Sequence, residues 1–294
     1  MKIAVTGASG LIGTALVPAL RRDGHQVLRL VRTPAHAPDE VTWNPSDNSL
    51  DHTLLAGTDA VIHLAGAGVG DKRWTHAYKA QILDSRVQGT RTIARAVATL
   101  EPRPSVLVCA SAIGFYGDTG DRPVDESAPA GTGFLSDVVQ QWEAAADQAR
   151  AAGVRVVHPR SGLVMSRTGG AWARMLPLFR LGLGGRLGSG RQYWSYITLA
   201  DEIRALTHLL GSQLTGPVNL TAPHPVTNSE LTHAMGQALH RPTILTVPAF
   251  ALKTVLGEFS TEVLGSARVL PTALQHDGFT FDHPDITSAV ATLA

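Results

Sequence analysis

The glycines nearest the start of the chain have the spacing of a phosphate-binding turn. Gly7, Gly10 and Gly13 follow an apolar run at residues 2–6 and open an amphipathic helical pattern at residues 11–22. The first glycine permits a tight turn, the second lets the backbone approach a pyrophosphate, and the third lets a helix pack closely on a strand. The helix N-terminus then presents its free amides to the phosphates. The sequence therefore predicts a dinucleotide site with contacts from Gly7, Ser9, Gly10, Leu11, Ile12 and Gly13.

A basic residue, Arg32, directly follows the second predicted strand at residues 26–31. A protein that selects NAD usually has Asp or Glu at this point to bind the adenosine ribose, and this chain has neither. A guanidinium can instead bind a 2′-phosphate through two parallel hydrogen bonds. The alternative is that Arg32 is an ordinary solvated arginine. We predict NADP(H) as the cofactor, with Arg32 as the selecting residue.

The elements that would position these residues alternate between short β-rich runs and helical stretches. The expected strands are residues 2–6, 26–31, 60–64, 105–110 and 154–158, and the expected helices are 11–22, 90–99 and 142–152. Strands separated by helices of this length form βαβ units, which predicts an α/β fold with a Rossmann doubly wound parallel sheet. Glycine and proline become more frequent after Pro159. We expect a nucleotide domain at residues 1–158, to which 193–215 return, and a smaller mixed C-terminal substrate lobe at 159–294.

Composition narrows the class of protein. The 294 residues are 44% hydrophobic and 17% charged with a net charge of +1, which argues against a disordered chain and against a nucleic-acid partner. The single cysteine, Cys109, permits neither an internal disulfide nor a cysteine-based zinc site. No signal-peptide pattern is present, and the apolar stretch at residues 244–256 is too short and interrupted to span a bilayer. We expect a cytoplasmic protein without a membrane partner or a metal.

Four further motifs resemble those of a known family. They are the segments 59–66 (Asp-Ala-Val-Ile-His-Leu-Ala-Gly), 85–90 (Ser-Arg-Val-Gln-Gly-Thr), 111–117 (Ser-Ala-Ile-Gly-Phe-Tyr-Gly) and 193–201 (Tyr-Trp-Ser-Tyr-Ile-Thr-Leu-Ala-Asp). Together with the glycine turn they resemble the extended short-chain dehydrogenases/reductases, the group of nucleotide-sugar epimerases and dehydratases. The tail at 216–226, 240–242 and 270–271 is similar to the C-terminal domain of an epimerase-like subfamily. The resemblance implies further cofactor contacts at Leu64, Ala65, Gly66 and Ser111.

The resemblance also implies a catalytic set that this chain lacks. The family uses a Tyr as general acid/base, a Lys four residues later that lowers the pKa of the Tyr, and a Ser or Thr that orients the substrate. These positions fall at Phe134, Val138 and Ala112, while Ser111 points to the opposite face of its strand. Tyr116 is the candidate replacement because it follows the fifth strand on the ligand side of the sheet. The alternative is that Tyr116 is a packed turn residue.

A substrate class is indicated by the charge pattern of residues 148–200, which contain no Asp or Glu. The same stretch holds Arg150, Arg155, Arg160, Arg167, Arg174, Arg180, Arg186 and Arg191. Arginines that converge on a cleft favour an anionic small molecule such as a nucleotide sugar, whereas arginines scattered over the surface favour none. Two functions remain open: an NADP(H)-dependent, epimerase-like oxidoreductase with a non-standard proton donor, and a catalytically silent NADP(H)-binding sensor or regulatory protein. A homodimer is expected from the helices around Arg86 and Trp142, where the family often pairs subunits.

Overall fold

The computed structural model describes all residues from 1 to 294. Its centre is a nine-stranded sheet in the order β14-β9-β6-β5-β1-β2-β3-β4, with β7 paired to β9. These strands are β1 (Lys2–Thr6), β2 (Gln26–Val31), β3 (Glu40–Asn44), β4 (Ser49–Leu50), β5 (Ala60–His63), β6 (Val106–Cys109), β7 (Ser111–Ala112), β9 (Arg155–Ser161) and β14 (Gly216–Leu220). Every pair is parallel except β3–β4. The predicted Rossmann sheet is therefore confirmed.

The chain direction across the sheet reverses between β1 and β5. From β1 the chain moves outward through β2 to β3, and from β5 it moves the other way through β6 and β9 to β14. In a doubly wound sheet the connecting loops separate at such a switch point and leave a crevice at the carboxyl ends of the strands. The loops after β1, β2, β5 and β6 therefore surround the expected ligand site.

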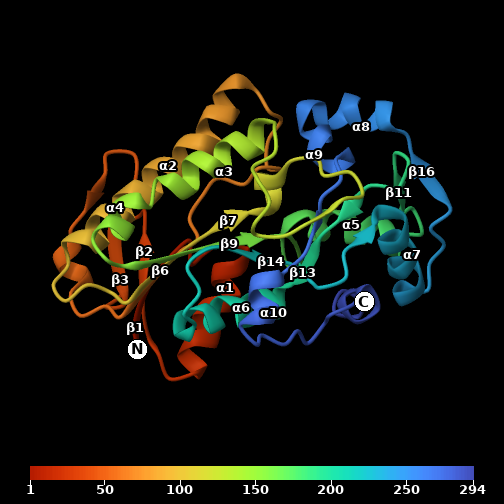
Figure 1. The fold of residues 1–294 in the computed structure, drawn as a ribbon. Coiled ribbons are helices and arrows are strands. Elements are labelled where there is room, and N and C mark those ends of the chain that lie inside the picture. Colours follow the sequence, from red (N-terminus) through yellow and green to blue (C-terminus); the bar gives the residue numbers. More distant parts are fainter.

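Helices cover both faces of the sheet, as Figure 1 shows. Helices α1 (Leu11–Arg22) and α6 (Leu199–Gly211) lie on one face, where Leu16, Ile203 and Leu206 join the largest apolar cluster. The other face carries α2 (His76–Thr99), α3 (Phe134–Ala144) and α4 (Asp147–Ala151). Valine and isoleucine dominate the strands between these layers because both faces of a parallel sheet are buried.

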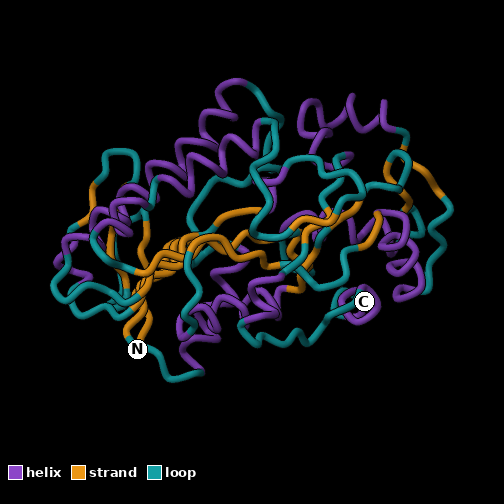
Figure 2. The backbone as a smooth tube through the Cα atoms, viewed as in Figure 1, coloured by secondary structure: helices purple, strands orange, loops and turns teal.

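The second lobe is built of short strand pairs and helices. Figure 2 shows its strands as small separate pieces beyond the main sheet. Its elements are β8 (Pro123–Val124), β10 (Leu163–Met165), α5 (Gly170–Arg180), β11 (Gly185–Leu187), β12 (Tyr193–Trp194), β13 (Tyr196–Thr198), β15 (Val226–Thr227), α7 (Asn228–Leu239), β16 (Leu245–Val247), α8 (Ala249–Leu256), α9 (Ser260–Leu264), β17 (Arg268–Val269) and α11 (Ile286–Ala291). Helix α10 (Thr272–His276) instead packs against β14 of the main sheet. Trp172, Tyr196 and Met235 form the centre of the lobe's own apolar cluster.

The nucleotide fold contains more of the chain than the sequence predicted. β9 continues past residue 158 to Ser161, β14 pairs with β9, and Leu274 and Phe279 enter the same apolar cluster as α1. Pro159 does not end β9, because β6 pairs with β9 only as far as Val157 and β7 pairs from Arg160 onward. Proline is tolerated where no ladder hydrogen bond is required of its nitrogen. The expected boundary at 158 therefore falls inside a strand.

No helix in the structure combines the length and the apolar character required to cross a membrane.

Candidate functional site

The glycine turn is closed by direct backbone contact with the loop after β5. Gly7 has φ +68°, and a Cβ there would lie 2.8 Å from the carbonyl carbon of Leu64. A Cβ on Gly13 would lie only 2.2 Å from the carbonyl oxygen of Gly7. Neither position accepts a side chain, since real Cβ atoms do not approach backbone so closely. The turn thus packs directly against both α1 and the loop after β5.

The N-terminus of α1 is open toward the crevice. Its N-cap residue is Gly10, which makes no side-chain capping hydrogen bond, and both Ser9 and Gly10 are exposed. The first-turn amides of a helix have no intrahelical partner, and here no side chain replaces one. Leu11 and Ile12 begin the helix and are partly buried. Free amides and the positive end of the helix dipole make this helix N-terminus a suitable binding site for a pyrophosphate.

Thr6 ties the carboxyl end of β1 to that of β5. Its hydroxyl accepts hydrogen bonds from the amides of Leu64 at 3.1 Å and Ala65 at 3.2 Å. The same hydroxyl lies 2.7 Å from Nδ1 of His63. Burial lowers the pKa of His63 to about 4, so its ring is neutral at physiological pH. The predicted contact residues Leu64 and Ala65 therefore have their amides engaged within the protein, while Gly66 is exposed.

Arg32 stands directly after β2 with no acidic partner. Its side chain is exposed and forms no ion pair. The nearest acids along the chain are occupied: Asp39 binds Arg29 at 2.8 Å, and Glu40 binds Arg29 at 3.0 Å. A guanidinium without a carboxylate at the end of β2 is free to bind a phosphate.

Tyr116, the proposed proton donor, ends a 3-10 turn (Ile113–Tyr116) and is only 3% exposed. Its hydroxyl donates to Oδ1 of Asn219 at 2.8 Å and accepts from Arg160 at 3.0 Å. Burial is the largest effect on this phenol and raises its pKa. Both hydrogen-bonding roles of the hydroxyl are filled by protein groups. These contacts favour the packed-tyrosine alternative.

A buried ion pair lies next to Tyr116. The guanidinium of Arg160 binds both carboxylate oxygens of Glu143, each at 2.8 Å, and Ser111 donates to Oε1 of Glu143 at 2.6 Å. Burial opposes ionisation of Glu143, but the guanidinium and these hydrogen bonds hold its pKa below the usual range. The predicted cofactor contact Ser111 is itself buried and committed to Glu143. Glu143 lies on α3 and Arg160 on β9, so no local sequence pattern could have indicated that the two residues pair.

The arginines between residues 149 and 200 do not converge on one cleft. Arg155 donates to the carbonyls of three residues between positions 209 and 214, Arg167 donates to Thr292, and Arg160 is buried against Glu143. Arg174 alone of the eight contacts the loop after β5, through Asp71 at 3.1 Å. The expectation of a converging cluster is therefore corrected. Six of the eight bind separate acceptors through their side chains, and the side chains of Arg180 and Arg191 form no hydrogen bond or ion pair.

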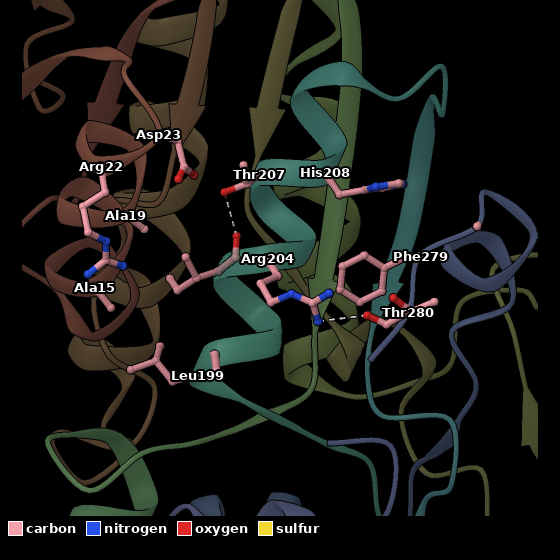
Figure 3. A pocket seen from close by; sticks show the side chains of 13 residues that line it. Ala15, Ala19, Arg22, Asp23, Leu199, Arg204, Thr207, His208, Phe279 and Thr280 are labelled. Carbon is pink, nitrogen blue, oxygen red and sulfur yellow. Dashed lines mark hydrogen bonds between the residues drawn. The ribbon is translucent and has the colours of Figure 1, made fainter. Parts of the chain in front are cut away.

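A groove lies elsewhere on the molecule. A groove of about 740 Å³ lies between α1, α6 and residues 278–280. Figure 3 shows Arg204 crossing it to donate to the carbonyl of Thr280, at 2.9 Å, beside the ring of Phe279. It contains none of the residues of the glycine turn or the β5 loop.

Comparison with known proteins agrees with the nucleotide-site geometry. Residues 3–220 match the NAD dependent epimerase/dehydratase family. The chain belongs to this family. Residues 247–293 match DUF1731, a domain of unknown function. The epimerase-like subfamily expected from the tail of the sequence is thus confirmed together with its C-terminal domain.

Relatives of this epimerase-family chain align over nearly all of its length. An epimerase family protein of Mycobacterium leprae is 46% identical over 292 residues, covering 98% of this chain and 94% of that protein. The bovine epimerase family protein SDR39U1 is 36% identical, covering 99% and 98%. The crystal structure of human SDR39U1 with NADPH superposes with a TM-score of 0.89 at 31% identity, covering 99% and 98% of the two chains.

The resemblance drawn from the sequence assigns the catalytic Tyr and Lys positions to Phe134 and Val138 on α3. Phe134 and Val138 lie one turn apart on α3 and pack in an apolar cluster with Trp74. The ammonium of Lys79 lies 4.5 Å from the centre of the Phe134 ring and also binds Glu258 at 2.6 Å. No hydroxyl or amine therefore occupies the two α3 positions, and Lys79 is held outside them by its own partner.

Proposed function

We propose that this epimerase-family chain binds NADP(H), with the pyrophosphate at the N-terminus of α1 and the 2′-phosphate at Arg32. The observation that carries the proposal is the end of β2, where an exposed arginine stands and the two nearest acids along the chain, Asp39 and Glu40, pair with Arg29. The human relative crystallised with NADPH supports the same choice of cofactor. An acid at the end of β2 would instead favour NAD by binding the ribose hydroxyls.

The order of the strands sets where the rest of the cofactor lies in this proposal. From Arg32 after β2, a dinucleotide that crosses the glycine turn after β1 reaches the loops after β5 and β6. The reactive nicotinamide then lies between Gly66 and the segment at Ser111 and Ala112. When bound, NADP(H) supplies or accepts a hydride. The chain's own residues bind the cofactor, exclude water and orient a small molecule against it.

We propose that this chemistry is an epimerase-like or oxidoreductase step on a small molecule, carried out without the Tyr–Lys pair. An anionic substrate such as a nucleotide sugar stays a prediction. Among the arginines that motivated it, only Arg174 lies at the loop after β5.

A second candidate function is a catalytically silent NADP(H)-binding sensor or regulatory protein. It is favoured by the apolar packing of Phe134 and Val138, and by the full engagement of the Tyr116 hydroxyl. A proton must leave or arrive as a hydride is transferred to or from a hydroxyl–carbonyl pair, and no free donor stands at these positions. Turnover of NADPH by a panel of nucleotide sugars and neutral sugars separates the two candidates.

The first experiment is a titration of the wild type and Arg32→Ala with NADPH and with NADH, followed by nicotinamide fluorescence. Loss of a charge-assisted contact of about 1.5–3 kcal/mol predicts NADPH binding weakened about 10- to 100-fold, with NADH binding unchanged. Arg91→Ala is the matched control, because Arg91 is exposed on α2 and makes no side-chain hydrogen bond or ion pair. Equal effects of Arg32→Ala on both cofactors would refute the assignment of Arg32.

A further inference from the structure

Exposed apolar side chains gather at the end of the molecule formed by α5, β11, β16 and α8, opposite β2 and β3 in Figure 1. Nine large apolar residues of the whole chain are exposed, and seven of them belong to two segments of this region. The seven are Leu178, Leu181, Leu183, Ile244, Leu245, Phe250 and Val255. Single exposed apolar residues are common on proteins, whereas a concentration of this kind marks an interaction surface.

The two segments lie side by side and are joined by backbone contacts. β11 pairs in parallel with β16, which places Gly185 opposite Leu245. At the end of α5, the carbonyl of Arg180 accepts a hydrogen bond from Nε of Arg241 at 2.8 Å. The apolar residues of both segments therefore belong to one region of the surface.

Helix α8 continues this region and leaves its apolar side chains without a partner in the chain. A Cβ on Gly188, directly after β11, would lie 4.0 Å from the Cβ of Ala249, the first residue of α8. No residue of α8 is buried, although Lys253 is its only charged residue, and Phe250 and Val255 are each 73% exposed. A helix of this composition normally buries its apolar residues against another element. Its exposure indicates a surface that something outside the chain covers.

The same two segments contain cations and no anions. Residues 148–200 and 231–257 include no Asp or Glu. Of the acids that flank the second range, Glu230 closes the capping box of α7 and Glu258 binds Lys79 at 2.6 Å. The arginines and lysines exposed beside the apolar residues form no ion pair; they are Arg180, Arg186, Arg191, Arg241 and Lys253. These five cations and the seven exposed apolar residues together are called the α8 face below.

Charge distinguishes between the occupants that this face can have. A second copy of the chain, related by a twofold axis, would bring the same cations together with no carboxylate between them. An anionic bilayer instead supplies phosphates for the cations and a hydrocarbon boundary for the apolar side chains. The sequence predicts no membrane partner because it lacks a spanning stretch, but a peripheral contact requires no such stretch.

We propose that the α8 face docks reversibly on the surface of an anionic lipid bilayer. Phe250, Leu181 and Ile244 enter the headgroup region, while Arg180 and Lys253 bind lipid phosphates. The inference goes beyond the proposed function and is independent of it, since no residue of the α8 face belongs to the glycine turn or to the loop after β5.

The test is flotation of the whole chain with two kinds of vesicle, one of phosphatidylcholine alone and one of phosphatidylcholine and phosphatidylglycerol in equal parts. The wild type should float with the anionic vesicles only, and less of it should float as the salt concentration rises. Arg180→Ala together with Lys253→Ala should weaken binding about 25-fold, because each basic residue near an anionic surface contributes about fivefold. Neither side chain makes a hydrogen bond, so the double variant should keep the stability of the wild type.

A second variant tests the apolar contribution. Phe250→Ser should weaken binding to anionic vesicles about 10-fold or more, because a phenyl ring is lost from the buried contact. The matched controls are Arg91→Ala, an exposed arginine of α2, and Leu54→Ser, an exposed leucine in the 3-10 turn His52–Leu55. Both controls should float like the wild type.

Four results would each overturn the inference. Equal binding to both kinds of vesicle, or binding to neither, would exclude an anionic bilayer as the partner. Controls that lose as much binding as the α8-face variants would show adsorption through the general charge of the protein. A wild type that is a dimer in solution and becomes a monomer with Phe250→Ser would show that a second copy covers this face. Binding of polyglutamate as tight as that of the anionic vesicles would indicate an acidic protein partner instead.

Discussion

Glu202 allows a direct test of how burial changes the pKa of a carboxyl group in this fold. It lies on α6 and is completely buried, with one carboxylate oxygen accepting from the hydroxyl of Ser161 at 2.6 Å. The other oxygen has no hydrogen-bond partner. Burial raises the pKa of Glu202 from 4.5 to about 7, because the charged form is poorly solvated there. Glu202→Gln replaces the group with a neutral one of similar shape that can still accept from Ser161.

The direction of the effect follows from proton linkage. The folded state holds the proton of Glu202 more tightly than the unfolded state does. The corresponding stability is complete below the unfolded pKa of 4.5 and is lost as the pH rises toward about 7. The difference between these two pKa values corresponds to about 3 kcal/mol. Because Gln does not titrate, the free energy of unfolding of Glu202→Gln should increase relative to that of the wild type as the pH rises.

The assay is urea unfolding of both proteins between about pH 5 and about pH 8, where the difference in unfolding free energy should grow by about 2–3 kcal/mol. The difference is the diagnostic quantity, because other buried groups change the stability of both proteins alike. Asp84→Asn, an exposed position on α2, controls for removal of a carboxylate from the surface. A difference that stays constant across the range would refute the assignment of the raised pKa to Glu202.

Three further predictions concern the site itself. Gly13→Ala should destabilise the protein by about 3 kcal/mol or more and abolish NADPH binding, because its methyl group would collide with the carbonyl of Gly7; denaturant unfolding and fluorescence titration check this. Tyr116→Phe should lower the free energy of unfolding in urea by about 1–3 kcal/mol, because Asn219 loses its hydrogen-bond donor, and it should bind NADPH normally. A variant of unchanged stability that has lost turnover would instead indicate that Tyr116 is catalytic. His63, whose pKa falls to about 4, should remove stability as the pH drops below its usual value of 6.5, and His63→Gln should flatten that acid limb of the unfolding profile.

The parts of the fold that the sequence predicted well are those set by local pattern. β1, α1 and β2 begin and end at the predicted residues, because an apolar run, a glycine turn and an amphipathic stretch each fix their own bounds. α2 begins at His76, well before the predicted start at residue 90, since its first turns are mixed in polarity and pack through Tyr78 and Ile82. The sequence predicts that β9 ends at residue 158, because Pro159 has the local pattern of a strand end.

In the candidate site, too, the features set by local sequence could be predicted and those that join distant residues could not. The conformation of the glycine turn and the position of Arg32 directly after β2 could be predicted because each is set by consecutive residues. The hydrogen bond between Tyr116 and Asn219 joins residues 103 positions apart, and no local pattern encodes it. Polar networks that cross elements need the tertiary structure.

The return of the chain to the central sheet has a consequence for biosynthesis. β14 completes the row of strands, α6 covers α1, and residues as late as Phe279 fill the same apolar cluster. A ribosome that has released the chain only as far as the end of β9 at Ser161 therefore exposes the open side of β9 and an uncovered face of α1. Such half-finished sheets are prone to aggregate or to pair with another chain. The nucleotide fold can close only after nearly the whole chain has emerged, so we expect nascent chains to depend on chaperones and a severed N-terminal half to be insoluble.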